Sequence, residues 1–243
     1  RQGKFDVVIE AQGLTKSAGI GWLSGARQRI GFVRGEFSGR ELSPWFNNIL
    51  VNPQQDHVVD QHLELLRPLE IVDPEVRFDL PRTDDDVIVI DKIKSRLEID
   101  RGFVLIQPGA GWPSKLWPGE RYAQVAKWLW EKHHLNSMIL WSGQEEQSLA
   151  KQIVQDAGPG TLLAPSTSLP QLAELARRAK FFIGPDTGPL HLAAAVGTKC
   201  VGLYGPMSAT RCGPYGQGHV ILQNVCLQGG ARSRRNASDE SMR

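Results

Sequence analysis

Residues Phe181 to Pro206 read FFIGPDTGPLHLAAAVGTKCVGLYGP, and this stretch decides the fold class. The apolar run at 181–183 ends at a Gly-Pro pair, which is typical of a strand with both faces covered. A second Gly-Pro pair, at 188–189, opens a helix of small residues, and Cys200 to Tyr204 reads as the next buried strand. Strand, turn, helix and strand in this order predict one unit of an α/β fold with a parallel sheet.

The turn between that strand and helix carries four residues with chemical potential, namely Asp186, Thr187, Gly188 and, in the first helical turn, His191. Ligands of open α/β sheets bind beyond the carboxyl ends of strands, where a helix N-terminus offers N–H groups and a positive dipole end. The turn therefore predicts a site for a phosphorylated, hydroxyl-rich ligand. A structural alternative stays open for each residue, because Asp and Thr are ordinary N-caps, glycines serve tight turns and a helical histidine is often packed.

Strands and helices alternate through the second half of the chain. We expect strands at 103–107, 137–142 and 162–163, and helices at 118–134, 145–157 and 169–179. Such alternation is typical of a doubly wound parallel sheet.

The first part of the chain is less regular. We expect strands at 5–9 and 29–33, helices at 13–23, 56–69 and 87–97, and loop with some helix at 34–55. Residues 73–86 are rich in Pro, Asp and Arg and are the best linker candidate. We therefore predict a first domain at 1–72, a linker with a connecting helix at 73–100, and a second domain at 101–243.

The bulk composition excludes several classes of protein. The 243 residues are 41% hydrophobic and 22% charged, as in an ordinary globular protein, and a net charge of +2 gives no support for a nucleic-acid partner. No apolar run approaches the roughly 18 to 20 residues that span a bilayer. Cys200, Cys212 and Cys226 show neither metal-ligand spacing nor an even disulfide framework, so we expect a reducing cytoplasm and no metal site.

Three segments together resemble the ADP-heptose:lipopolysaccharide heptosyltransferase family. DTGPLHLAAA at 186–195, followed by a strand and Tyr-Gly-Pro, resembles the family signature, and QPGAGWPSKLWP at 107–118 resembles its donor-phosphate loop. AQGLTKS at 11–17 is closer to heptosyltransferase I than to heptosyltransferase II. The similarity extends from about Phe5 to Gly216. It implies the glycosyltransferase-B architecture of two Rossmann-like domains, here the C-terminal part of the acceptor-side domain and a nearly complete nucleotide-sugar donor domain.

The resemblance also implies an activity. Members of the family transfer heptose from ADP-heptose to the lipopolysaccharide inner core, with a lipid A–Kdo acceptor, by an inverting reaction that needs no metal and no cofactor. This points to a cytoplasmic enzyme peripheral to the inner membrane. Family members begin upstream of Arg1, where their general base, an aspartate, lies, and end beyond Arg243. We therefore expect a chain truncated at both ends that transfers no sugar by itself.

The donor-phosphate loop and the turn supply the expected catalytic residues, Lys115 and Asp186. Lys115 lies in a Gly/Pro/Ser loop just beyond a strand, where an ammonium group can meet a diphosphate, although a solvated surface lysine is the alternative. Gly111 and Ser114 belong to the same loop. By resemblance, Asp186 binds hydroxyls of the heptose, and Thr187 and Gly188 donate to the diphosphate. His191 supports the start of the helix.

The remaining assignments are less specific. Glu145 or Glu146, after the strand that ends at Ser142, is expected to hydrogen-bond the ribose, and the sequence does not choose between them. Ser168 is expected beside the adenine, and an N-cap role for it is compatible. Arg40, in SGRELSPWFNN, resembles an acceptor-side arginine that would suit phosphate or carboxylate groups, with a structural role as the alternative.

Two other functions stay open from the residues alone. One is a glycosyltransferase-B enzyme with a different nucleotide sugar, because Lys115 and the D-T-G-x-x-H turn specify neither adenine nor heptose. The other is a non-catalytic module that binds a nucleotide sugar or a glycan. A dehydrogenase is disfavoured because no G-x-G-x-x-G follows any expected strand.

Overall fold

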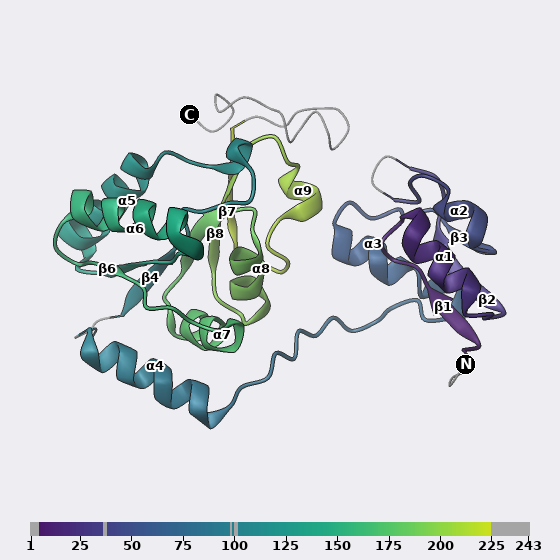
Figure 1. Ribbon diagram of the computed structural model, residues 1–243, viewed down its shortest axis with the longest axis horizontal. Helices are drawn as coiled ribbons and strands as arrows, with labels where there is room; N and C mark the ends of the chain where they lie inside the picture. The colour runs from purple at the N-terminus through teal and green to yellow at the C-terminus, as the bar shows by residue number, and fades with distance from the viewer. Residues whose placement is uncertain (1–4, 36–37, 98, 100–101, 225–243) are drawn as a thin grey trace. The chain divides into compact units, whose positions relative to one another are not determined.

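A computed structural model describes residues 5–35, 38–97, 99 and 102–224 of the chain. The chain divides into two compact units, Arg1–Val76 and Arg77–Arg243, which are coloured purple to blue and blue to yellow in Figure 1. Each unit contains one parallel β-sheet with helices between its strands, so the predicted α/β class is confirmed. No helix in the described part of the chain combines the length and the apolar content that a membrane crossing requires.

The first unit is built on a three-stranded parallel sheet in the order β1-β2-β3. Its strands are β1 (Val7–Ile9), β2 (Gln28–Phe32) and β3 (Ile49–Val51). Its helices are α1 (Thr15–Leu23), α2 (Ser43–Phe46) and α3 (Val58–Glu64), and a 3₁₀ turn follows at Arg67–Leu69. The small core is formed by the buried side chains of Ile30, Phe32, Val51 and Leu65.

Two elements of this unit differ from the sequence-based prediction. The expected helix at 56–69 ends at Glu64, because the ring of Pro68 clashes with the carbonyl group four residues earlier and supplies no N–H for the helical ladder. The strand β3 lies within the segment at 34–55 that was predicted as loop with some helix. Its three residues are too short to show an alternating pattern.

The second unit is built on a six-stranded parallel sheet in the order β6-β5-β4-β7-β8-β9. The strands are β4 (Phe103–Ile106), β5 (Asn136–Ile139), β6 (Thr161–Leu163), β7 (Phe182–Pro185), β8 (Cys200–Tyr204) and β9 (Val220–Gln223). All but β9 were predicted. β9 is an edge strand with largely exposed side chains, and its apolar run of only three residues, 220–222, is too short to distinguish a strand from other structure.

Helices cover both faces of this sheet (Figure 1). They are α4 (Asp84–Arg96), α5 (Gly119–His133), α6 (Gly143–Ala157), α7 (Leu169–Arg178), α8 (Gly188–Ala195) and α9 (Ala209–Cys212). The helices α5 and α6 pack in one core, and α4, α7 and α8 pack in the other. The central strand β4 serves both, since Phe103 and Leu105 enter one core while Val104 and Ile106 enter the other.

The strand order creates a crevice at the carboxyl ends of β4 and β7. The chain runs outward from β4 through β5 to β6 on one side, and from β7 through β8 to β9 on the other. The connections that leave the two neighbouring central strands therefore diverge, and ligands of such sheets bind where they part. This topology brings the loop at 107–118 beside the turn at 186–188.

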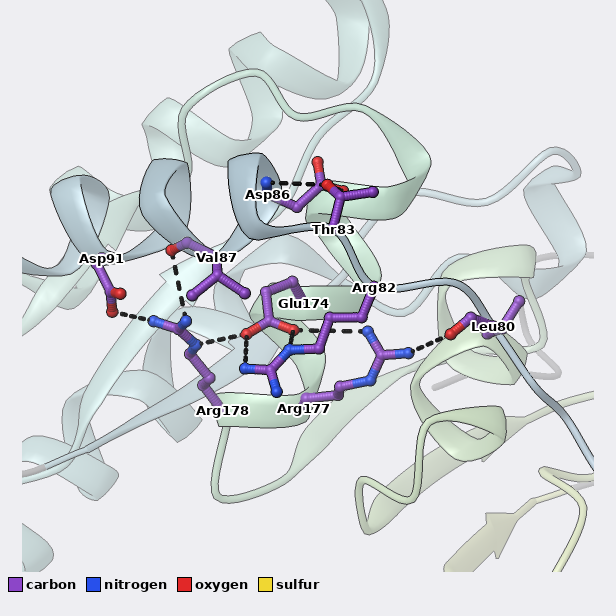
Figure 2. Close-up of polar contacts among 9 residues, drawn as sticks. All are labelled: Leu80, Arg82, Thr83, Asp86, Val87, Asp91, Glu174, Arg177 and Arg178. Carbon is purple, nitrogen blue, oxygen red and sulfur yellow. Dashed lines mark hydrogen bonds and ion pairs between the residues drawn. The ribbon is translucent and has the colours of Figure 1, made fainter.

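A buried carboxylate on α7 fastens the segment at 78–91 to the rest of the second unit. The side chain of Glu174 is 1% exposed, and Figure 2 shows it among three arginines. Arg82 donates from Nε and a terminal nitrogen to the two carboxylate oxygens, at 2.9 and 3.0 Å, and Arg178 donates from Nε at 2.8 Å. Arg177 completes the group at 3.5 Å. Burial of Glu174 is tolerated because all three charges around it are opposite.

The same arginines reach along the connecting segment. Arg177 donates to the backbone oxygen of Leu80 at 2.9 Å, and Arg178 pairs with Asp91 on α4. The ring of Phe78 contacts that of Tyr215, with centroids 5.9 Å apart. Residues 78–91 are thus held against the rest of the second unit, whose boundary with the first falls at Val76, within the segment 73–100.

We expect Glu174→Ala to lower the free energy of unfolding by about 2 to 3 kcal/mol, because it leaves the arginines without their shared partner. The expected loss of stability is smaller than for a fully buried ion pair, because the side chain of Arg82 is 56% exposed. The control is Glu131→Ala, which removes only an exposed 4.0 Å contact with Lys127 and should cost less than about 0.5 kcal/mol. Urea denaturation followed by tryptophan fluorescence measures both, and equal stabilities would contradict the account.

The same comparison has a defined pH dependence. Burial raises the pKa of the Glu174 carboxyl, but the hydrogen bonds from Arg82 and Arg178 lower it more, so the pKa lies below its usual 4.5. A depressed carboxyl pKa stabilises the folded state fully above pH 4.5 and progressively less as the pH falls through the folded-state pKa. The stability gap between the wild type and Glu174→Ala should therefore be constant above pH 4.5 and shrink below it.

Candidate functional site

Three predicted site residues meet at the crevice between β4 and β7. Lys115 Nζ donates to Asp186 Oδ2 at 2.6 Å and to the Asp186 backbone oxygen at 2.9 Å. His191 Nε2 lies 2.9 Å from the other carboxylate oxygen, Oδ1. The side chains of Lys115 and Asp186 are 17% and 11% exposed, so this ion pair is largely withdrawn from water. The solvated-surface alternative for Lys115 is thereby excluded.

Local structure sets the position of the lysine. Pro113 begins a 3₁₀ turn (Pro113–Lys115) that follows the loop after β4. Ser114 in the middle of this turn is buried. The next residues return the chain to the core, where the ring of Trp117 packs edge-on against that of Tyr122 at 4.9 Å. The backbone on both sides of Lys115 is therefore fixed, and its side chain is directed toward the turn after β7.

Asp186 is held as a carboxylate. Burial raises the pKa of its side chain, but the hydrogen bonds from His191 and Lys115, together with the positive charge of Lys115, outweigh burial and lower the pKa below its usual value. At neutral pH the Asp186 side chain is therefore negatively charged, and each of its two oxygens has one side-chain partner, Lys115 or His191.

The N-cap alternatives for Asp186 and Thr187 are not what the structure shows. The carboxylate of Asp186 is engaged with Lys115 and His191, and Thr187 Oγ1 donates to the backbone oxygen of Pro185 at 3.3 Å. Thr187 occupies the N-cap position of α8 but makes no side-chain cap hydrogen bond. The positive end of α8 is thus left without a side-chain cap, which is an arrangement suited to an anion.

The glycines of the two loops fall into two kinds. A Cβ atom built on Gly111 or Gly188 would meet nothing within 4 Å, and neither residue has a positive φ. Neither backbone strain nor packing therefore requires glycine at these positions, whereas close approach of a ligand would. Gly109 is different, because a Cβ there would lie 2.2 Å from the carboxyl carbon of Glu146.

A pocket of about 360 Å³ opens beside this cluster. Residues that follow four neighbouring strands, β4, β5, β6 and β7, contribute to its lining. Its polar groups come from Gln107, Ser142, Glu146, Thr167 and Thr187, and its apolar wall from Leu140, Trp141, Ala164, Leu169 and Leu172. A mostly apolar wall with a few convergent polar groups is typical of a small-molecule site.

The structure separates the two candidate glutamates. Glu146 lines the pocket, and its Oε2 accepts from the Ser142 backbone N–H at 2.8 Å. Glu145 is exposed on the first turn of α6. The geometry therefore favours Glu146 as the carboxylate that a ligand in the pocket would meet.

Ser168 and Arg40 are the other two predicted residues. Ser168 caps α7 through a capping box with Gln171, so its hydroxyl has the structural role, while its neighbours Thr167 and Leu169 line the pocket. Arg40 is an exposed residue of the first unit. Its backbone N–H donates to the Gly13 oxygen at 2.9 Å.

The sequence-based prediction overlooked Gln107 and Trp141 as pocket residues. Gln107 directly follows β4 and is 5% exposed, and Trp141 Nε1 donates to the Ala164 oxygen at 2.7 Å. Both residues lie at the carboxyl-terminal ends of expected strands, at 103–107 and 137–142, and this position was the available signal. Within the described ranges, no group of three His, Cys, Asp or Glu side chains has a metal-binding arrangement.

Comparison with protein families and curated proteins identifies relatives. The model of glycosyltransferase family 9 (heptosyltransferase) matches residues 1–241. The lipopolysaccharide core heptosyltransferase OpsX of Haemophilus influenzae is 27% identical over 215 residues, which cover 87% of this chain and 60% of the relative. Lipopolysaccharide heptosyltransferase 1 of Escherichia coli K12 is 25% identical over 223 residues, or 90% and 66%. The chain thus spans about 60 to 66% of the length of these relatives.

Solved structures share the fold. Escherichia coli heptosyltransferase WaaC with ADP superposes with a TM-score of 0.70 at 23% identity, over 91% of this chain and 67% of that one. The glycosyl transferase family 9 structure from Veillonella parvula superposes with a TM-score of 0.76 at 22% identity, over 91% and 63%. These similarities confirm the predicted fold class, a partial two-domain Rossmann-like arrangement of the glycosyltransferase-B type.

We expect Gly188→Ala to change the free energy of unfolding by less than about 1 kcal/mol. The added methyl group meets no atom within 4 Å beyond its chain neighbours and alanine reduces the entropy of the unfolded chain, whereas Pro189 disfavours a helical conformation of the alanine before it. Gly109→Ala should instead lower the stability by about 1 to 3 kcal/mol, because its methyl group collides with Glu146. Chemical denaturation of the two variants measures the difference. A destabilised Gly188→Ala would show that this glycine serves the fold.

Proposed function

This chain belongs to glycosyltransferase family 9, the heptosyltransferase family, and from that premise we propose that it provides the donor-binding half of a lipopolysaccharide heptosyltransferase. The donor is ADP-heptose, and the acceptor is the lipopolysaccharide inner core of the lipid A–Kdo type. The observation that carries the proposal is the ion pair of Lys115 with Asp186 at the switch point of the sheet, beside a pocket that contains Glu146. The relatives named as lipopolysaccharide heptosyltransferases support the same substrate class.

In this proposal Lys115 holds the diphosphate. An ammonium group has three N–H donors, and two of them are used by Asp186, so one is left for a phosphate oxygen. The start of α8, which has no side-chain cap, and Gly111 both contribute to the lining of the pocket. As the bond from heptose to ADP breaks, negative charge grows on the leaving diphosphate, and these positive groups stabilise it. We propose that the reaction is inverting and uses this charge in place of a metal ion.

Asp186 and Glu146 bind the two sugars of the donor. Each Asp186 oxygen has a second lone pair beyond its bond to Lys115 or His191, and these can accept from heptose hydroxyls. Glu146 accepts from the ribose hydroxyls. The apolar wall of the pocket, which includes Leu169 and Leu172, receives the adenine. His191 acts through Asp186 by fixing the orientation of its carboxylate.

The acceptor side belongs to the first unit. We propose that Arg40, which is exposed there, contacts a phosphate or carboxylate group of the acceptor. Since the acceptor is a lipid, the enzyme would work on the cytoplasmic surface of the inner membrane. Family resemblance supports this placement.

The direct test is nucleotide selectivity. Isothermal titration of the 243-residue chain with ADP, UDP and GDP should show binding of ADP at least tenfold tighter than of the other two nucleotides, because the pocket is assigned to adenine. Equal affinities would favour a transferase with another nucleotide sugar. Absence of binding to all three would contradict the donor-site assignment.

Lys115→Ala provides a second test. Loss of a charge-assisted hydrogen bond should weaken ADP binding by about 10- to 100-fold, while binding of adenosine changes by less than about twofold. Lys127→Ala, on the exposed surface of α5, is the matched control and should leave both affinities unchanged. An equal loss of ADP and adenosine affinity on Lys115→Ala would argue against a phosphate role.

A further inference from the structure

Gln107 links the two central strands to the carboxylate in the pocket. Its backbone N–H donates to the Ile183 oxygen of β7 at 2.9 Å, so its position is fixed at the crevice itself. Its side-chain Nε2 donates to Glu146 Oε2 at 3.2 Å and lies 3.4 Å from the backbone oxygen of Gly109. One buried amide group therefore joins the loop after β4 to the first turns of α6.

The carboxylate of Glu146 is held on three sides. Its Oε2 accepts from both Gln107 and the Ser142 backbone N–H. Its third neighbour is Gly109, where the missing side chain makes room for the carboxyl group. Oε1 accepts no hydrogen bond from any residue in the described ranges, and it packs closely against Gly109. The arrangement fixes one oxygen and leaves the other for a ligand in the pocket.

We propose that Gln107 is a positioning residue that orients Glu146 for the ribose of the donor. This inference rests on the proposed function, because it takes the ligand of Glu146 to be the hydroxyl groups of a nucleotide. Gln107 itself does not need to touch the ligand. It determines which oxygen of Glu146 faces the pocket. It also fixes the position of that oxygen relative to the phosphate loop, which carries Gly109 and Lys115.

The chemistry of the side chain explains why an amide stands at this position. The NH₂ group of glutamine offers two donors, which match the carboxylate oxygen and the backbone oxygen in front of it. A glutamate would place a second negative charge against Glu146, and an apolar residue would leave Oε2 with one partner fewer. Asparagine is one methylene group shorter and would not reach.

The test compares two nucleotides that differ only in the groups that Glu146 would bind, ADP and 2′,3′-dideoxy-ADP. Isothermal titration of the wild-type chain should show about tenfold tighter binding of ADP. Gln107→Met keeps the length of the side chain and removes its hydrogen bonds. It should weaken ADP binding by about five- to tenfold, less than the loss of a direct hydrogen bond between a charged group and the ligand, because Gln107 acts through Glu146, and it should change dideoxy-ADP binding by less than about twofold.

The matched control is Gln152→Met, the same chemical change on the exposed face of α6, where the glutamine bonds only Asp156 among the described residues. It should leave both affinities and their ratio unchanged. Gln107→Asn is the second variant, and it keeps a polar group at the buried site. The two nucleotides can therefore still be compared if the methionine variant does not fold. It too should remove the preference for ADP.

Four outcomes would overturn the inference, and they are distinguishable. An equal loss of affinity for both nucleotides would show that Gln107 only supports the fold. An unchanged preference for ADP in both variants would show that Glu146 needs no positioning. A wild-type chain that binds ADP and dideoxy-ADP equally would refute the ribose role of Glu146 itself, and one that binds neither would refute the proposed function.

Discussion

The ion pair between Lys115 and Asp186 is the contact on which the site depends. It joins the loop after β4 to the turn after β7, at the point where the connections of a doubly wound sheet part. Because the pair is largely buried, each charge requires the other, and His191 holds the second carboxylate oxygen. The pair keeps a positive and a negative group side by side, one suited to a diphosphate and the other to sugar hydroxyls.

The rest of the second unit supports this contact from both faces of the sheet. Apolar side chains alternate between two cores along β4, which fixes the strand and the loop that leaves it. On α7 the same helix lines the pocket through Leu172 and anchors the connecting segment through Glu174. Burial of Glu174 is tolerated because three arginines surround it. The segment at 78–91 is therefore attached to α7, the helix that also forms part of the pocket wall.

Much of this could be predicted from the sequence, for definable reasons. Strands buried on both faces read as apolar runs. Asp186 follows one of these runs, and Lys115 lies in a loop beyond another that resembles the donor-phosphate loop of the family. The prediction was incomplete where the signal is not local. The strands β3 and β9 each contain only three consecutive apolar residues, which is too short a run to distinguish a strand from other structure. Gln107 shows its role only through Glu146, which lies 39 residues further along the chain.

The central claim is that the crevice at β4 and β7 is a site for the nucleotide diphosphate of the donor. A crystal structure of the chain with ADP tests it most directly. We predict the diphosphate within hydrogen-bonding distance of Lys115 Nζ and the start of α8, with the ribose on Glu146. A nucleotide bound elsewhere, such as in the cavity of about 440 Å³ lined by Trp117 and Arg121, would contradict the account.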